Sequence, residues 1–292
     1  MGWTADDMPD QSGRRVIVTG ANSGLGLSTA RELARKGAEV VLACRNLDKG
    51  RAALADVGGR ATLEQLDLAS LASVRAFAEA RSEPVDLLIN NAGIMAPPEG
   101  RTADGFESQF GTNHLGHFAL TGLLLDRLLA GDAPRVVTLS SIMHRYGRLA
   151  LDGNRRYRRW RAYSDSKLAN LLFMRELDRR ARAAGAPLVS VAAHPGWAAT
   201  HLQTASPPLI DRTVLTVMNR LVAQSADEGA LPTLFAATTG VPGGSFTGPD
   251  GRNELRGAPQ LVGMSARARD EAAARRLWDT SERLTGVTYA FA

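Results

Sequence analysis

The chain has 292 residues, of which 44% are hydrophobic and 22% charged, and its formal net charge is +5. These proportions are typical of a soluble globular protein with a sizeable core, and they exclude a disordered or fibrous chain. The single cysteine, Cys44, excludes an internal disulfide and fits a reducing compartment.

Residues 1–13 form an N-terminal extension in which we find no targeting pattern. No basic region precedes an apolar stretch, as it would in a secretory signal, and Asp6 breaks the myristoylation pattern. No run of about 18 apolar residues occurs, which excludes an ordinary membrane-spanning helix but leaves contact with a membrane surface open. We therefore predict a cytoplasmic protein.

From residue 14 onward, short apolar runs alternate with amphipathic segments of helical length, as expected of βαβ units on a parallel sheet. The predicted strands are residues 14–20, 38–44, 61–66, 85–93, 135–140 and 188–194. The predicted helices are residues 25–36, 47–57, 70–81, 106–129, 162–184 and 266–284. The fold class is therefore α/β, with one doubly wound parallel sheet and helices on both faces across residues 14–292.

The alternation weakens after Pro195. Residues 196–263 mix Pro, Gly and Thr with two apolar segments, 209–222 and 228–237. We expect this region to form an irregular cap over the substrate.

A glycine-rich stretch, "TGANSGLG" (residues 19–26), follows the first predicted strand and opens the first helix. Such a turn lets the backbone approach a pyrophosphate at the helix N-terminus. The interval between Gly20 and Gly24 departs from the G-x-G-x-x-G spacing, and a plain turn would explain one or two of the glycines. The position at the first βα junction favours a dinucleotide site.

The second predicted strand ends in Cys44 and Arg45 rather than in an acid. A nucleotide fold that binds NAD usually has Asp or Glu about 20 residues after the glycines, where it accepts hydrogen bonds from the ribose. An acid would repel a 2′-phosphate, whereas a guanidinium pairs with one in bidentate fashion. Arg45 therefore favours NADP(H), with an exposed loop arginine as the alternative.

Six motifs occur in one fixed order, and together they resemble the short-chain dehydrogenase/reductase family. They are "TGANSGLG" (19–26), "NNAG" (90–93), "NHLGHF" (113–118), "VVTLSS" (136–141), "YSDSK" (163–167) and "HPG" (194–196). The long "YSDSKLANLLF" helix makes the chain most similar to the retinol-dehydrogenase-like and protochlorophyllide-reductase-like branch. Ala169 stands where the pigment-reducing members carry a cysteine, which argues against that activity. The resemblance implies a Rossmann-type sheet and an NADP(H)-dependent oxidoreductase.

Tyr163 and Lys167 are four residues apart in a predicted helix and so share one face. An alkoxide left by hydride transfer needs a proton, which a phenol of ordinary pKa near 10 exchanges poorly at neutral pH. A nearby ammonium and the positive nicotinamide of the oxidised cofactor are expected to lower that pKa. Tyr163 is the candidate acid/base and Lys167 its tuner, with a helix-surface Tyr/Lys pair as the alternative.

The resemblance implies further roles, position by position. Ser141, rather than Ser140, would hydrogen-bond the reacting oxygen, and Asn113 would bind a water that links Lys167 to solvent, unless it marks only a helix kink. Asn90 would line the nicotinamide side, while Asp67, which has a helix cap as its alternative role, would contact the adenine with Leu68. The cofactor-binding candidates are Gly20, Asn22, Ser23, Gly24, Leu25, Gly26, Arg45, Asp67, Leu68, Asn90, Ala92, Gly93, Tyr163, Lys167, Pro195, Gly196 and Thr200.

Three histidines and one basic stretch are two further candidates for a functional role. His114, His117 and His194 match no metal-ligand spacing, so no metal is expected. The stretch "RRYRRWRAY" (residues 155–163) is either a solvated loop or a lid in which Tyr157 or Trp160 covers the substrate while some arginines face an anionic group or a membrane surface.

We therefore expect an NADP(H)-dependent alcohol dehydrogenase or carbonyl reductase for a small to medium apolar substrate, with a catalytically idle redox sensor or scaffold as the alternative. No recognisable nucleic-acid module accompanies the scattered arginines, so no nucleic-acid partner is expected. By analogy with the family, a dimer or tetramer would form through the two long helices.

Overall fold

The computed structural model describes residues 2–149, 156–197 and 224–291. Within them, eight strands form one sheet in the order β3-β2-β1-β4-β5-β6-β7-β8, and only β8 runs antiparallel to its neighbour. The strands are β1 (Arg15–Thr19), β2 (Glu39–Cys44), β3 (Ala61–Gln65), β4 (Leu87–Asn90), β5 (Arg135–Leu139), β6 (Val189–Ala193), β7 (Phe246–Pro249) and β8 (Pro259–Leu261).

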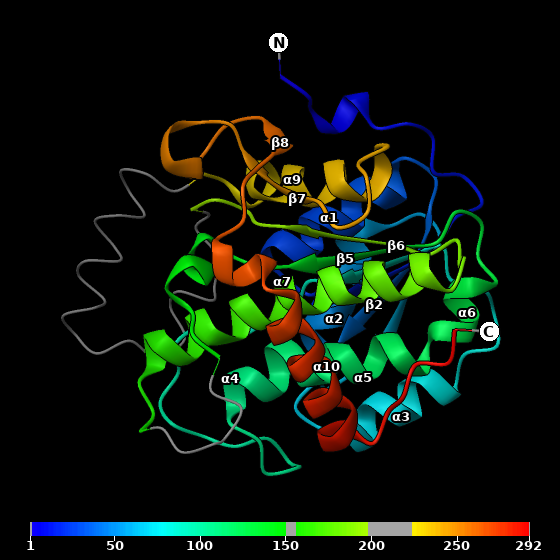
Figure 1. Ribbon diagram of the computed structural model, residues 1–292. Helices are drawn as coiled ribbons and strands as arrows, with labels where there is room; N and C mark the ends of the chain where they lie inside the picture. The colour runs from blue at the N-terminus through cyan, green and yellow to red at the C-terminus, as the bar shows by residue number, and fades with distance from the viewer. Residues whose placement is uncertain (1, 150–155, 198–223, 292) are drawn as a thin grey trace.

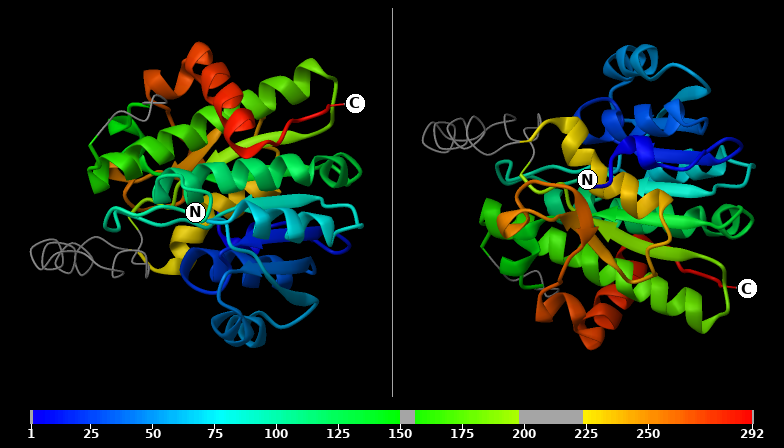
Figure 2. Two further views of the ribbon diagram at one scale, coloured as in Figure 1. Left: turned by 90° about the horizontal axis from the view of Figure 1, so that it is seen from below. Right: turned by 90° about the horizontal axis from the view of Figure 1, so that it is seen from above.

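Helices cover both faces of this sheet (Figures 1 and 2). One face carries α1 (Gly24–Arg35), α2 (Leu47–Val57) and α9 (Ala226–Thr238), and α1 packs against both of the others. The other face carries α3 (Leu71–Glu79), α5 (Gly116–Leu123) and α7 (Arg159–Ala183), and α10 (Glu271–Thr285) packs on α7. Because both faces are covered, the central strands are buried on both sides, which explains their continuous apolar runs.

The chain crosses from one face of the sheet to the other between β1 and β4, which are neighbours in the sheet but not in sequence. The loops that leave the carboxyl ends of these two strands therefore diverge. In doubly wound folds this divergence opens a crevice in which ligands bind. The glycine-rich stretch follows β1 and the "NNAG" motif overlaps the end of β4, so both lie at this crevice.

The helix predicted over residues 106–129 is wrong in one respect, because the structure divides it. α4 (Ser108–Phe110) leads into a π-helical turn, η2 (Gly111–Leu115), which is followed by α5 and, after a break at Leu124, by α6 (Leu125–Leu129). A Cβ on Gly116 would collide with the backbone carbonyl of Leu68, so glycine lets this helix approach the loop after β3. Periodicity along the sequence does not register a one-residue π insertion.

The region predicted to form an irregular cap holds regular elements in its described part. β7 and β8 extend the sheet beyond β6, and α9 packs on α1. Both strands are short and include proline, a residue that usually argues against a strand, so their sequences give a weak signal. The predicted apolar segment 209–222 lies outside the described residues.

Aromatic side chains fill the core between α5, α7 and α10. The Phe118 ring is fully buried and lies 5.6 Å from the Phe173 ring, 5.1 Å from that of Trp278 and 5.0 Å from that of Tyr289, measured between centroids. Tyr289 also donates a hydrogen bond to the Phe118 carbonyl. This cluster fixes α5, and with it the π-helical turn that precedes α5.

We predict that Phe118→Ala lowers the free energy of unfolding by about 3 to 5 kcal/mol, because the cavity it leaves is enclosed by other rings. Urea denaturation measures the change. Tyr146→Ala is the control, since that side chain is 72% exposed and its loss should cost about 0.5 kcal/mol or less. Equal effects of the two substitutions would contradict this account of the core.

Candidate active site

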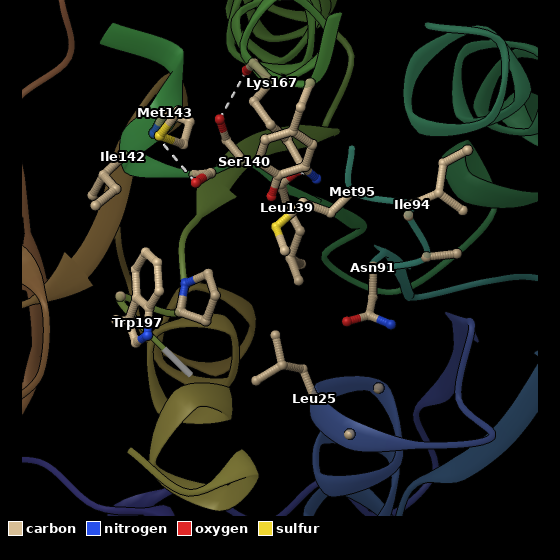
Figure 3. Close-up of a pocket in the computed structure, with 18 of the residues that line it drawn as sticks. Leu25, Asn91, Ile94, Met95, Leu139, Ser140, Ile142, Met143, Lys167 and Trp197 are labelled. Carbon is tan, nitrogen blue, oxygen red and sulfur yellow. Dashed lines mark hydrogen bonds between the residues drawn. The ribbon is translucent and has the colours of Figure 1, made fainter. Parts of the chain in front are cut away.

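A pocket of about 150 Å³ lies where the carboxyl ends of β1, β4, β5 and β6 meet (Figure 3). One end is backbone and small side chains from the loop after β1 and the segment after β4, and the other is largely apolar. Its lining comprises Ser23, Gly24, Leu25, Gly26, Asn91, Ala92, Gly93, Ile94, Met95, Leu139, Ser140, Ser141, Ile142, Met143, Trp160, Tyr163, Lys167, Pro195, Gly196 and Trp197. The structure thus brings together residues from five of the six motifs.

The glycine-rich stretch packs tightly against the segment after β4. A Cβ on Gly26 would lie 2.5 Å from Nδ2 of Asn91, and one on Gly20 would lie 3.0 Å from Cα of Ala92. Gly20 also has a positive φ of 67°. No side chain caps the first turn of α1, and Ser23, Gly24, Leu25 and Gly26 at this turn line the pocket. The turn has the form of an anion-binding helix N-terminus.

Asn90 and Asn91 have different surroundings. Asn90 is fully buried, donates from Nδ2 to Oγ1 of Thr121 on α5 and does not line the pocket. Asn91 lines the pocket and donates from Nδ2 to the Thr19 carbonyl. The role of Asn90 beside the nicotinamide, which the family resemblance implies, stays a prediction.

Tyr163 and Lys167 lie together on α7 at the pocket. Nζ of Lys167 is 5.6 Å from the centroid of the Tyr163 ring and donates to the Leu139 carbonyl at 3.2 Å. Burial lowers the pKa of the Lys167 ammonium to about 8. Burial also raises the pKa of the Tyr163 phenol to about 12, and a hydrogen bond with the Ser141 side chain acts in the opposite direction. Burial therefore dominates, and the shift of the Tyr163 pKa is upward. The lowering expected from Lys167 together with the positive nicotinamide of the oxidised cofactor stays a prediction.

The two adjacent serines point in different directions. Ser140 is buried and donates from Oγ to the Lys167 carbonyl at 2.8 Å, which ties β5 to α7. Ser141 accepts a hydrogen bond from the Met143 backbone N–H at 3.2 Å, and its side chain acts to lower the pKa of the Tyr163 phenol. Ser141 therefore presents its hydroxyl beside the phenol, and Ser140 serves the packing of the helix.

Asn113 lies in the π-helical turn with its side chain fully engaged. Oδ1 accepts from the Ile94 N–H at 2.8 Å, while Nδ2 donates to the Ile94 carbonyl and to Oγ of Ser166, both at 3.0 Å. The Asn113 side chain thus holds the segment after β4. The predicted water between Asn113 and Lys167 stays a prediction.

Arg45 follows β2 directly and is exposed at the carboxyl edge of the sheet. Among the described residues, no carboxylate pairs with its guanidinium. The neighbouring Cys44 is buried at the end of β2, and burial raises the pKa of its thiol to about 11. A free guanidinium at this edge is available to an anionic group.

The remaining candidates differ in how near they lie to the pocket. Pro195 and Gly196 line it, and Gly196, with φ at 66°, packs so closely on the Leu255 carbonyl that a Cβ there would collide with it. Asp67 accepts from the Ala69 N–H at 2.9 Å, and Leu68 is buried against α5, so neither lines this pocket. Thr200 lies outside the described residues.

The basic stretch, residues 155–163, overlaps the start of α7, and its side chains point in different directions. Trp160 lines the pocket, with its ring edge-on to Tyr163 at 6.5 Å. Tyr157 points elsewhere: its hydroxyl donates to the Pro97 carbonyl at 2.7 Å and accepts from Nε2 of Gln109 at 3.0 Å. Arg156 and Arg158 are exposed, and Arg155 lies outside the described residues.

The three histidines considered for metal binding each bond to other groups. His114 bonds Oγ of Ser281, and His194 bonds the Glu254 carboxylate at 3.1 Å. His117 bonds Oγ1 of Thr19 and the Asn113 carbonyl. In the described part of the chain, no group of three or more His, Cys, Asp or Glu side chains is arranged to hold a metal ion.

Sequence reasoning missed several residues that form the apolar end of the pocket: Ile94, Met95, Ile142, Met143 and Trp197. Each directly follows a recognised motif, "NNAG", "VVTLSS" or "HPG". A rule that extends each motif by two residues past the strand end would have found them.

The fold and this pocket define a nucleotide-dependent oxidoreductase of the doubly wound class, and comparison with known proteins gives the family. The family model of the short chain dehydrogenases matches residues 14–208. The chain is 42% identical to human retinol dehydrogenase 13 over 94% of this chain and 85% of that protein. It is 40% identical to mouse retinol dehydrogenase 11 over 94% of this chain and 87% of that protein. The chain belongs to the short-chain dehydrogenase/reductase family, in its retinol-dehydrogenase-like branch.

Solved structures share the fold. An uncharacterised protein from Mycobacterium paratuberculosis matches with a TM-score of 0.86 and 50% identity over 99% of this chain and 100% of that one. A protein from Beutenbergia cavernae, described as an NAD(P)-dependent gluconate 5-dehydrogenase with bound NADP, matches with a TM-score of 0.62 and 27% identity over 78% of this chain and 90% of that one. The predicted family and fold class are confirmed, and the chain is a pyridine-nucleotide oxidoreductase.

We predict that Lys167→Met stabilises the protein at neutral pH. The pKa of Lys167 falls from 10.5 to about 8 on folding, so between these values the unfolded chain binds a proton that the folded chain does not, and wild-type stability rises with pH. Below pH 8 the buried ammonium costs up to about 3 kcal/mol. The Leu139 carbonyl keeps its bond from Nδ2 of Asn170 in the variant.

Urea denaturation at pH 7 and pH 10 measures the effect. The variant should be more stable at pH 7, and the difference should shrink toward pH 10. Parallel stability curves for the two proteins would show that burial of this ammonium does not control the pH dependence.

Proposed function

We propose that the protein is an NADP(H)-dependent reductase of carbonyl groups, or dehydrogenase of the corresponding alcohols, on a small to medium apolar substrate. The observation that carries this proposal is the pairing of the Tyr163 phenol with Ser141 in a pocket whose other end is the glycine-rich turn. The coenzyme, when bound, supplies or accepts the hydride. The chain's own residues bind, orient and transfer the proton.

The pocket fits a dinucleotide at its glycine end. A Cβ would collide at Gly26 and be crowded at Gly20, and no side chain caps the N-terminus of α1, which suits a pyrophosphate. Gly24, Leu25 and Gly26 would hold the phosphates, with Asn22 and Ser23 beside them. Ala92, Gly93, Pro195 and Gly196 would enclose the nicotinamide end, and the adenine contacts of Asp67 and Leu68, like any contact of Asn90 and Thr200, remain proposals.

The proton chemistry follows from the state of the phenol. Because burial raises the pKa of Tyr163 to about 12, the phenol stays protonated through the neutral range and is ready to donate. A substrate alkoxide is a stronger base than a phenolate, so proton transfer to it from the Tyr163 hydroxyl is favourable. Ser141 would hold the substrate oxygen beside that hydroxyl, and Lys167 would stabilise the phenolate that results.

The preference for NADP(H) rests on Arg45. Its guanidinium is exposed and has no partner among the described residues, at the strand end where an NAD-binding fold usually has an acid. A phosphate there would gain a charge-assisted, bidentate contact. The Beutenbergia cavernae structure with NADP shows that a member of this fold holds that coenzyme.

The substrate class rests on the far end of the pocket. Side chains without charge surround the space beyond Tyr163, and two of them are tryptophans, Trp160 and Trp197. Such walls favour an apolar substrate body with one polar group at the catalytic serine. The retinol dehydrogenases of the same branch are named for an apolar alcohol.

The cellular location and the oligomeric state are also proposals. No helix in the described ranges has the length and apolar character needed to cross a membrane. We propose a cytoplasmic location and, by analogy, a homo-oligomer. A catalytically idle NADP(H) sensor is the alternative, and the catalytic geometry argues against it, because Ser141, Tyr163 and Lys167 converge on one pocket.

We predict that Tyr163→Phe lowers turnover by about 10²- to 10⁴-fold while NADPH binding stays within a few fold, because only the proton donor is lost. Carbonyl-dependent NADPH oxidation measures turnover, and fluorescence titration measures binding. Ser141→Ala should lower turnover by about 10²-fold, and the matched control Ser140→Ala should lower stability more than turnover. Near-normal turnover of Tyr163→Phe would refute the mechanism.

We predict that Arg45→Asp weakens NADPH binding by about 10- to 100-fold and changes NADH binding much less, because an acid repels the 2′-phosphate. Titration of both coenzymes measures this. Arg60→Ser is the control, since Arg60 is an exposed arginine that pairs with Glu39 at the opposite end of β2. A wild-type preference for NADH, or equal losses for both coenzymes, would show that Arg45 is only a loop residue.

A further inference from the structure

His117 is a buried histidine on α5 that the proposed mechanism does not use. Its side chain lies between two elements of the site, with Nε2 2.9 Å from Oγ1 of Thr19 on β1 and Nδ1 3.0 Å from the Asn113 carbonyl in the π-helical turn. Both partners are themselves fully buried. The two contacts therefore lie inside the protein, where polar groups depend on their hydrogen bonds.

The partners of His117 hold one segment of the pocket, residues 91–94, from two sides. Oγ1 of Thr19 accepts from the backbone N–H groups of Asn91 and Ala92, both at 3.0 Å. The Asn113 side chain pairs with the N–H and carbonyl of Ile94. Residues 91–94 are thus hydrogen-bonded to Thr19 at one end and to Asn113 at the other. We call Thr19 and Asn113 the supports of this segment, and His117 is hydrogen-bonded to both.

The hydrogen-bond inventory fixes the state of His117. The Asn113 carbonyl only accepts, so Nδ1 must carry the proton. The Thr19 hydroxyl has its two lone pairs occupied by the two backbone N–H groups, so its own proton points to an acceptor, and Nε2 at 2.9 Å is nearer than the Ile89 carbonyl at 3.3 Å. His117 is therefore neutral, as a donor to Asn113 and an acceptor from Thr19.

The electrostatic surroundings agree with the neutral form. Burial lowers the pKa of His117 to about 4; the hydrogen bond to the Asn113 carbonyl acts in the opposite direction, and the positive charge of Lys167 adds a smaller lowering. A second proton on Nε2 would face a hydroxyl whose lone pairs are already taken. The arrangement therefore holds unchanged across the neutral range.

We infer that His117 is a positioning residue: it orients the supports Thr19 and Asn113 so that residues 91–94 stay in place beneath the coenzyme, and it contacts neither coenzyme nor substrate. This rests on the proposed function, because residues 91–94 matter as the wall of a nicotinamide site. Gly93 shows how little movement is tolerated, since a Cβ there would lie 3.2 Å from Oδ1 of Asn113 and 3.6 Å from Nζ of Lys167.

The test compares three substitutions of His117 with a matched control. His117→Phe keeps the volume but loses both bonds, His117→Asn can keep the donor to Asn113, and His117→Gln can keep the acceptor for Thr19. His114→Asn is the control, because His114 is an equally buried histidine one turn away that bonds Ser281 on α10 instead. NADPH affinity, kcat and KM, and urea stability are measured for each variant.

We expect His117→Phe to weaken NADPH binding about tenfold or more, the equivalent of one lost hydrogen bond, and to lower kcat by up to roughly 100-fold through misplacement of the reacting groups. The Asn and Gln variants should recover part of both. His114→Asn should lose comparable stability yet bind NADPH within about twofold of wild type. Adding Thr19→Val to His117→Phe should cost less than the two separate losses combined, because both remove the same support.

Three results would overturn the inference: NADPH affinity and kcat unchanged in a folded His117→Phe, equal catalytic losses in the His114 control, or full additivity with Thr19→Val. If His117→Phe does not fold, the Asn and Gln variants decide by the same criteria. A wild-type protein that binds NADPH but reduces no carbonyl would refute the proposed function alone, since the affinity measurements test His117 without turnover.

Discussion

One buried positive charge constrains the whole carboxyl edge of the sheet. The Lys167 ammonium is 5% exposed, and burial disfavours its charged form. Three local features surround this ammonium. The Leu139 carbonyl at the end of β5 accepts a hydrogen bond from Nζ, and Ser140 donates one to the Lys167 carbonyl. Gly93 has no side chain, and a Cβ there would lie 3.6 Å from Nζ. Each of these features lowers the freedom of the pocket, and together they place the phenol, the hydroxyl of Ser141 and the glycine turn in fixed relation.

The features that sequence reasoning predicted correctly are those set by local pattern. The central strands β1 and β4 are nearly continuous apolar runs because both faces of the sheet are covered, and helical spacing correctly predicts that Tyr163 and Lys167 share one face of α7. Helix α1 begins within the glycine-rich stretch, as the sequence predicts. These features depend on residues close in sequence or on one regular period.

The features that were missed depend on contacts between distant parts of the chain. Gly116 packs against the Leu68 carbonyl directly after the π-helical turn, and β7 and β8 pair at the sheet edge despite their prolines. The upward shift of the Tyr163 pKa comes from burial, which depends on the whole surrounding fold. The different surroundings of Asn90 and Asn91 depend on where β4 ends, because successive side chains of a strand point to opposite faces of the sheet.

The position of Cys44 has a practical consequence for how this enzyme behaves under oxidative stress. Its thiol is shielded at the end of β2, and its raised pKa leaves almost none of the reactive thiolate at neutral pH. Peroxides, glutathione disulfide and alkylating reagents act on exposed thiolates, so the Cys44 thiol is shielded from them while the chain stays folded. Thiol-directed reagents should therefore modify this chain only when it unfolds.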